Sequence, residues 1–323
     1  MLINNIMELK YNYIIYHRNC PDGFAGLIIA HRSGNIHDEA LIKADVPYTE
    51  KVPEQIKDKD ILIIDVAYKL EILEEIIKLC NSLVFIDHHV TIKDDVENLK
   101  NKYSNKKLKI IYNQQKSGCA LTWKYFYPNN KPPRFIRLIE DQDTGTWKLP
   151  DTKYFMYALD VVYNKSIESL KNFNKWERLF NKNEVIKLIK KGKQYNEYIL
   201  HLVSNNNAYS IEYFPSQKFY DENIEFFDKP GQYKVAVFCG SCPSATILGN
   251  YIVKNIKIDF VIMWTFSLET KKYLITFRSD KVNVGKIAKL FGGGGHELAS
   301  SGSFYQAQYN IQDLFFPESI PRR

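Results

Sequence analysis

The feature that most constrains the fold is an alternation of short apolar runs with helical stretches in the first half of the chain. Three of the runs are typical of buried strands, namely Tyr11–Tyr16, Ile61–Ile64 and Leu83–Ile86. Between the last two runs, residues 69–80 carry apolar side chains at helical spacing. Since strands that alternate with helices form βαβ units, this half predicts a parallel sheet flanked by helices.

The second half of the chain predicts a smaller mixed α/β domain that follows a helical connector. Residues 183–203 show the apolar stripe of one long amphipathic helix. Beyond it, strands are expected at Val235–Phe238, Phe260–Trp264 and Tyr273–Phe277, and helices at Ala245–Val253 and Val284–Phe291. The glycines at 292–295 cannot hold regular structure cheaply, so a loop is expected there. We therefore expect an N-terminal α/β domain over residues 1–165, a helical connector over 166–207 and a second α/β domain over 208–323.

Acidic and histidine side chains follow the predicted N-terminal strands directly. They are His17 and Asp22 after the first strand, Asp65 after the second, and Asp87, His88 and His89 after the third. A further acidic pair, Asp141 and Asp143, follows a predicted helix over residues 134–140. Because the carboxyl ends of parallel strands open onto one crevice, these groups are expected to meet there. A single Asp after a strand is usually a helix cap, and only the coincidence at successive strand ends favours a functional site.

This combination of side chains is typical of a centre that holds two divalent metal ions. Carboxylates and imidazoles bind such ions together, often with one carboxylate between the two. Two ions roughly 3.5–4 Å apart position the attacking water and the scissile phosphate. Mixed Asp and His ligation favours Mn²⁺, with iron or Co²⁺ as alternatives, over a site lined by oxygen alone that would suit Mg²⁺. Mg²⁺ is kept as a further alternative cofactor. The net charge of +7 fits an anionic substrate, and it fits a solvated lysine-rich surface equally well.

The order of these motifs resembles the DHH phosphoesterase superfamily, which includes oligoribonucleases and RecJ-type exonucleases. In the N-terminal half, the resemblance rests on His17-x4-Asp22-Gly23, Asp65, Asp87-His88-His89 and the Asp141/Asp143 pair. In the C-terminal half, Phe277-Arg278-Ser279, Asn283-Val284 and the run from Gly292 to His296 resemble the DHH-associated domain. The resemblance implies an α/β fold, with a parallel sheet in the N-terminal domain and a smaller mixed α/β C-terminal domain.

The resemblance also implies a role for each matching residue. The metal ligands would be His17, Asp22, Asp65, His88 and one of Asp141 and Asp143, with Asp65 bridging both ions. Among the catalytic groups, Asp87 would fix His88, and His89 would contact the scissile phosphate. In the C-terminal domain the substrate would meet Arg278, Ser279, Gly293, Gly294, Gly295 and His296.

One position departs from the pattern of many family members. Where they carry an Asp-x-Asp pair in the first motif, this chain has Cys20 ahead of Asp22. A cysteine is not the expected ligand for a hard ion. Cys20 would therefore either weaken one metal site or mark a subgroup whose site is completed by His17 and water.

The function expected from the sequence is Mn²⁺-dependent hydrolysis of phosphate esters in short oligonucleotides, dinucleotides or nucleotides. The alternative is a catalytically weakened nucleotide-binding or sensor protein of the same fold. No run of about 18 apolar residues is present. The N-terminal residues also lack the apolar stretch of a secretory signal. We therefore expect a cytoplasmic protein with no membrane partner, and the resemblance also admits a homodimer.

Overall fold

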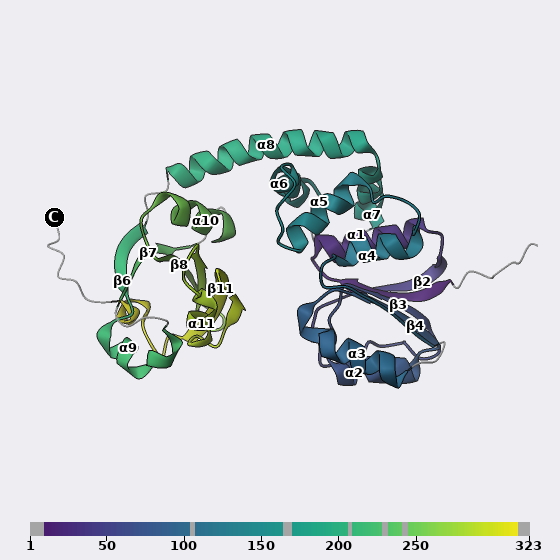
Figure 1. Cartoon of the computed structure of the whole chain (residues 1–323), viewed down its shortest axis with the longest axis horizontal. Coiled ribbons are helices and arrows are strands. Elements are labelled where there is room, and N and C mark those ends of the chain that lie inside the picture. The colour runs from purple at the N-terminus through teal and green to yellow at the C-terminus, as the bar shows by residue number, and fades with distance from the viewer. Residues whose placement is uncertain are drawn as a thin grey trace, which may run out of the picture. The chain divides into compact units, whose positions relative to one another are not determined.

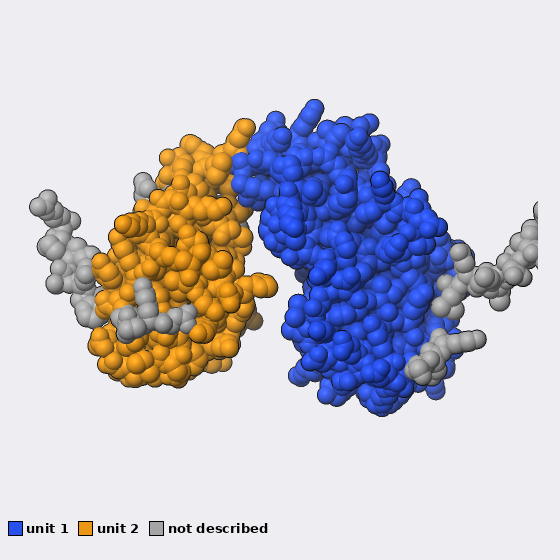
Figure 2. Space-filling view, viewed as in Figure 1, with its two compact units in different colours: residues 1–196 blue, residues 197–323 orange. Residues whose placement is uncertain are grey.

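The structure is a computed structural model, which describes residues 10–103, 107–163, 170–205, 209–227, 232–240 and 245–315. The chain divides into two units, residues 1–196 and 197–323 (Figures 1 and 2). The division falls within α8 (Lys182–Ser204). Of the predicted connector, residues 166–169 and 206–207 lie outside the described ranges.

The N-terminal unit is built on a five-stranded parallel sheet with the strand order β2-β1-β3-β4-β5. The strands are β1 (Tyr11–His17), β2 (Ile36–Asp45), β3 (Asp60–Ile64), β4 (Ser82–Asp87) and β5 (Leu108–Tyr112). One face is covered by α1 (Pro21–Arg32) and α4 (Gly118–Phe126), and the other by α2 (Leu70–Leu79) and α3 (Lys93–Lys102) (Figure 1). The central strands are therefore buried on both faces, which explains their nearly continuous apolar sequences. The predicted parallel sheet is confirmed.

Further helices thicken the layer that contains α1 and α4. They are α5 (Arg134–Asp143), α6 (Thr152–Tyr163), α7 (Leu170–Glu177) and the first part of α8. Strand β2 was not predicted, because half of the residues of this edge strand are exposed and polar residues interrupt its apolar ones. None of the described helices is long and apolar enough to cross a membrane.

The C-terminal unit contains a six-stranded mixed sheet with the order β10-β11-β9-β8-β7-β6. The strands are β6 (Tyr209–Phe214), β7 (Tyr233–Cys239), β8 (Phe260–Ser267), β9 (Lys272–Ser279), β10 (Gly294–His296) and β11 (Ala299–Tyr305). Only β7 and β8 pair in parallel among these described strands. α10 (Ala245–Asn255) packs on one face, while α9 (Gln217–Glu222) and α11 (Val284–Lys289) contribute to the core on the other. The predicted mixed α/β fold is confirmed, and short 3-10 turns lie at Val90–Ile92, Arg178–Phe180, Ile224–Phe226 and Ile311–Leu314.

The prediction of a loop over the whole glycine run is wrong for residues 294–296. These residues form β10, which pairs antiparallel with β11. A Cβ on Gly293 would lie 2.0 Å from Ser301 O, and a Cβ on Gly295 would lie 2.7 Å from Ala299 O. Glycine is therefore required here because the two backbones approach closely, which a count of glycines alone does not reveal.

Candidate metal centre

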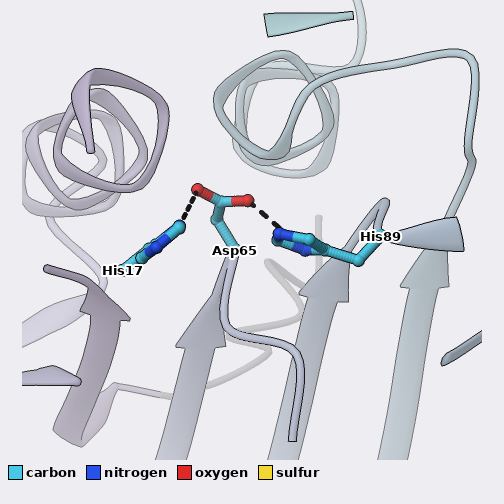
Figure 3. Close-up of side chains that lie close together, drawn as sticks. All are labelled: His17, Asp65 and His89. Atoms are coloured by element: carbon cyan, nitrogen blue, oxygen red, sulfur yellow. Dashed lines mark hydrogen bonds and ion pairs between the residues drawn. The ribbon is translucent and has the colours of Figure 1, made fainter. Parts of the chain in front are cut away.

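The acids and histidines that follow β1, β3 and β4 gather at the carboxyl edge of the N-terminal sheet (Figure 3). Asp65 is 1% exposed and lies at the centre of this cluster. Its Oδ2 is 3.2 Å from His17 Nδ1, and its Oδ1 is 3.1 Å from His88 Nε2. His89 Nδ1 lies 3.8 Å from the same Oδ1. One carboxylate thus contacts imidazoles carried by two different strands, one through each of its oxygens.

Two groups of side chains in this cluster are suited to hold a metal ion. The first consists of His17, Asp65 and His89, and the second of Asp22, His88 and Asp143. In the second group, His88 Nε2 lies 3.8 Å from Asp22 Oδ2 and 3.3 Å from Asp143 Oδ2. Because His88 also contacts Asp65, the two groups adjoin each other, as two neighbouring ions would require.

Asp22 is held in place by the first turn of α4. Its Oδ2 accepts a 2.5 Å hydrogen bond from the Gly118 amide, and its Oδ1 accepts a 2.9 Å bond from the Cys119 amide. The free amides at a helix N-terminus favour a carboxylate, so this contact orients Asp22. Sequence reasoning missed these donors, although Ser117 is a typical N-cap and does cap α4.

Asp87 organises the two histidines that follow it. Its Oδ1 accepts bonds from the backbone amides of His88 at 2.6 Å and His89 at 2.8 Å. The same oxygen lies 2.7 Å from His89 Nδ1, so the carboxylate fixes the orientation of that ring. The resemblance implied that Asp87 fixes His88; in the structure it contacts the backbone of His88 and the ring of His89.

Asp141 and Asp143 have different surroundings despite their closeness in sequence. Asp141 accepts bonds from Thr146 Oγ1 at 2.7 Å, Lys148 N at 2.7 Å, Leu149 N at 3.0 Å and Thr152 Oγ1 at 2.5 Å. These donors occupy both carboxylate oxygens, so Asp141 stabilises the loop that joins α5 to α6. The structure therefore places Asp143 in the cluster and Asp141 outside it.

The carboxylates of the cluster have pKa values that are shifted in opposite directions: those of Asp22 and Asp143 are raised, and that of Asp65 is lowered. Burial and the charge of Asp65 raise the pKa of Asp22 to about 6. Burial and the charges of Asp22 and Asp65 raise the pKa of Asp143 to about 8. Although burial opposes both shifts, hydrogen bonding to His17 and His88 lowers the pKa of Asp65 to about 2, and the bond to Asp65 raises the pKa of His88 to about 9. The cluster thus carries an excess of acidic groups that protons or cations must neutralise.

The side chains present fit divalent metal ions. Asp143 Oδ2 and Asp87 Oδ2 are buried and accept no hydrogen bond from the described residues. Buried acceptors without donors are rare, and a cation would satisfy them. Burial and the charges of Asp65 and Asp22 raise the pKa of the Cys20 thiol well above its usual range, so Cys20 is not poised as a thiolate ligand. Both candidate groups are complete without it.

The predicted substrate-binding residues of the C-terminal unit fall into different environments. Arg278 lies on β9, where it donates to Phe277 O at 2.7 Å and to Thr246 Oγ1 at 2.9 Å. Its Nε is buried and makes no hydrogen bond with the described residues. Ser279, in contrast, is engaged in a turn, since it donates to Asp259 O and accepts from two backbone amides.

The glycine run and the histidine that ends it lie at the edge of the C-terminal sheet. Gly294 has open space where a side chain would be, whereas Gly293 and Gly295 lie against the β11 backbone. His296 ends β10 and is exposed. Gly294 and His296 pair with β11 as well, but a side chain at Gly294 would meet no atom within 4 Å and His296 is exposed.

Comparisons with known proteins identify a domain in the C-terminal unit and one relative of the whole chain. Residues 233–315 match the DHHA1 domain. The C-terminal unit therefore carries a DHHA1 domain, which agrees with the resemblance to the DHH superfamily. It is 28% identical over 317 residues to an uncharacterized protein of Acanthamoeba polyphaga mimivirus, a match that covers 91% of this chain and 68% of that protein.

Solved structures of similar fold come from several bacteria. The pGpG-specific phosphodiesterase PggH from Vibrio cholerae is 13% identical, with a TM-score of 0.49, over 93% of this chain and 95% of that chain. RecJ from Thermus thermophilus, solved in complex with Mn²⁺, is 11% identical, with a TM-score of 0.37, over 92% of this chain and 50% of that chain. Similarity at this level leaves the substrate of this chain undetermined.

Proposed function

We propose that this chain is a metal-dependent phosphoesterase of the DHH family that hydrolyses phosphate esters of short oligonucleotides, dinucleotides or nucleotides. The observation that carries the proposal is the position of Asp65. This buried carboxylate contacts His17 through one oxygen and His88 through the other. Such an arrangement suits a carboxylate shared by two ions better than it suits a helix cap or a core residue.

The geometry supports a division of the ligands between two ions. Asp22, His88 and Asp143 would hold one ion, Asp65 and His17 would hold the other, and Asp65 would be shared. The mixed imidazole and carboxylate set favours Mn²⁺. When bound, such ions supply an acidified water and neutralise charge on the phosphate.

His89 is proposed to bind the scissile phosphate rather than a metal ion. Its Nδ1 is hydrogen-bonded to Asp87 Oδ1 at 2.7 Å, so that Nε2 is the ring nitrogen left to contact a substrate. Although burial opposes the shift, the hydrogen bond to Asp87 raises the pKa of His89. A charged imidazole would donate its Nε2 proton to a phosphate oxygen and stabilise the charge that develops there.

Arg278 is proposed to hold a second phosphate of the substrate on the C-terminal unit. The buried Nε–H lacks a partner among the described residues, and a guanidinium suits the geometry of a phosphate. Gly294 and His296 are proposed to contact the same end of the substrate. Ser279 is not part of this proposal, because its hydroxyl is already engaged in a turn.

The test is release of mononucleotides from labelled di- to pentanucleotides with and without Mn²⁺. We expect Asp65→Ala to abolish Mn²⁺-dependent cleavage. The matched control is Asp45→Asn, which alters a buried carboxylate at the end of β2 whose Oδ2 accepts a 2.6 Å bond from the Tyr68 hydroxyl. The control should keep its activity, and equal cleavage by wild type and Asp65→Ala would contradict the proposal.

The outcome also separates the enzyme from a nucleotide-binding or sensor protein. Bound metal without cleavage of any oligonucleotide would redirect the search to cyclic dinucleotides and nucleoside bisphosphates. A protein that binds nucleotide, holds no metal and cleaves nothing would be the sensor. The enzyme is favoured because neither group of candidate metal ligands includes the unusual Cys20.

A further inference from the structure

Trp147 is an exposed aromatic residue whose backbone conformation is strained. Its side chain is 53% exposed, whereas Trp123 is 8% exposed and Trp176 is 1% exposed. Its φ of 49° lies in the left-handed region, which is unfavourable for a bulky side chain. A conformation of this kind costs about 1–3 kcal/mol and persists only where its surroundings fix it.

The hydrogen bonds of Asp141 fix the backbone on both sides of Trp147. The Trp147 amide donates to Asp141 O at 3.1 Å. On either side, Thr146 Oγ1 and Lys148 N donate to Asp141 Oδ1, each at 2.7 Å. The indole is therefore carried on a rigid loop, although the loop itself is exposed to solvent.

This loop begins at the metal centre. Asp143, whose Oδ2 is 3.3 Å from His88 Nε2, ends α5, and the loop starts at the next residue. The hydrogen bond from the Trp147 amide to Asp141 O holds residue 147 close to the same end of α5. The backbone of Trp147 is thus held beside the helix end that carries one of the proposed metal ligands.

The chemistry around Trp147 favours a planar aromatic ligand over an apolar protein surface. Its neighbours Gly145, Thr146 and Lys148 are exposed and are not apolar. A Cβ on Gly145 would meet no atom of the described residues within 4 Å, so this side-chain position is open. A single ring among polar groups suits the face of one base, whereas protein docking requires a wider apolar patch.

We propose that Trp147 is a stacking platform for the nucleobase next to the scissile phosphate, so that the substrate is a base-bearing ester and not a simple polyphosphate. This rests on the phosphoesterase function proposed above. Lys148, exposed beside the indole, adds positive charge near the nucleotide. Trp147 acts in this way as a specificity residue, and it takes no part in the chemistry at phosphorus.

The test compares the binding of adenosine 5′-monophosphate and ribose 5-phosphate to the Mn²⁺-loaded full chain by calorimetry. We expect wild type to prefer the nucleotide, and Trp147→Ala to reduce that preference by roughly 5–150-fold. Trp147→Phe should keep most of it, because a ring remains. The control is Tyr198→Ala, which removes an aromatic side chain that is 64% exposed on α8 and should change nothing.

Hydrolysis supplies the second measurement. Trp147→Ala should raise the KM for a dinucleotide while kcat and the cleavage of an abasic analogue stay near wild-type values. The stacking role would be overturned if Trp147→Ala kept the wild-type preference for the nucleotide over ribose 5-phosphate. It would also be overturned if the variant lost activity equally on the dinucleotide and on the abasic analogue. Failure of wild type to hydrolyse any ester would instead remove the phosphoesterase function, and the binding comparison would still decide the role of Trp147.

Discussion

Gly118→Ala should damage the metal centre without altering any ligand. The added Cβ would lie 2.7 Å from Asp65 Cβ and 2.9 Å from Asp22 Oδ2, whereas ordinary contact begins at 3.4 Å. At least one of the two carboxylates must therefore move by about 0.5–1 Å, which exceeds the tolerance of roughly 0.5 Å for a functional site. The bond from the Gly118 amide to Asp22 would be strained as well. Since the loss of groups that orient ligands costs about 10–100-fold in metal affinity, we expect a loss of that size.

The assay is titration of the purified chain with Mn²⁺, followed by calorimetry, alongside thermal unfolding. Overpacking costs about 1–3 kcal/mol, so some loss of stability is expected in Gly118→Ala. Gly34→Ala is the control, because Gly34 has a φ of 76° and nothing within 4 Å of the added Cβ. It should lower the Tm and leave Mn²⁺ affinity unchanged. Wild-type Mn²⁺ affinity in folded Gly118→Ala would refute the reasoning.

Two further predictions concern the acids at the end of α5. Against the effect of burial, hydrogen bonds from Thr152 and Thr146 lower the pKa of Asp141. Its stabilisation is therefore present above the ordinary carboxyl pKa and is lost as the pH falls through the lowered value. Asp141→Asn should cost about 1–3 kcal/mol in urea unfolding at pH 7 and much less in acid, and an equal loss at both would contradict this. At pH 7, Asp143 and His88, with pKa values of about 8 and about 9, hold protons that Mn²⁺ must displace. Calorimetry in buffers of different ionisation enthalpy should show proton release and an affinity that rises with pH, and release of no proton would count against this site.

The strands and the centre of the cluster could be predicted because burial restricts which residues a strand can carry. β3 and β4 are covered on both faces, so nearly all of their residues are apolar and the polar residue that follows marks the strand end. Parallel pairing then forces Asp65 and Asp87 to the same edge. The alternation of apolar runs with helical stretches thus predicted the parallel sheet and the edge of the sheet at which Asp65 and Asp87 lie.

Contacts made by backbone groups could not be predicted in this way. The amides of Gly118 and Cys119 carry no side-chain signature, so only the docking of α4 beside α1 reveals that they hold Asp22. The same applies to β10, whose glycines are required by the approach of the β11 backbone. In both places the determining neighbour is distant in sequence, and side-chain periodicity does not report on it.

The choice between Asp141 and Asp143 depends on the donors that reach each carboxylate. Helical periodicity cannot separate the two, since Asp141 lies one turn after the buried Leu138 and Asp143 one turn after the buried Ile139. The chain leaves α5 and returns four donors to Asp141, so the protein itself stabilises the charged form of this carboxylate. Asp143 meets a histidine and other carboxylates, and its buried Oδ2 accepts no hydrogen bond from the described residues. A buried carboxylate oxygen without donors must be neutralised by a proton or a cation, and for this reason Asp143, not Asp141, is the ligand proposed for the metal centre.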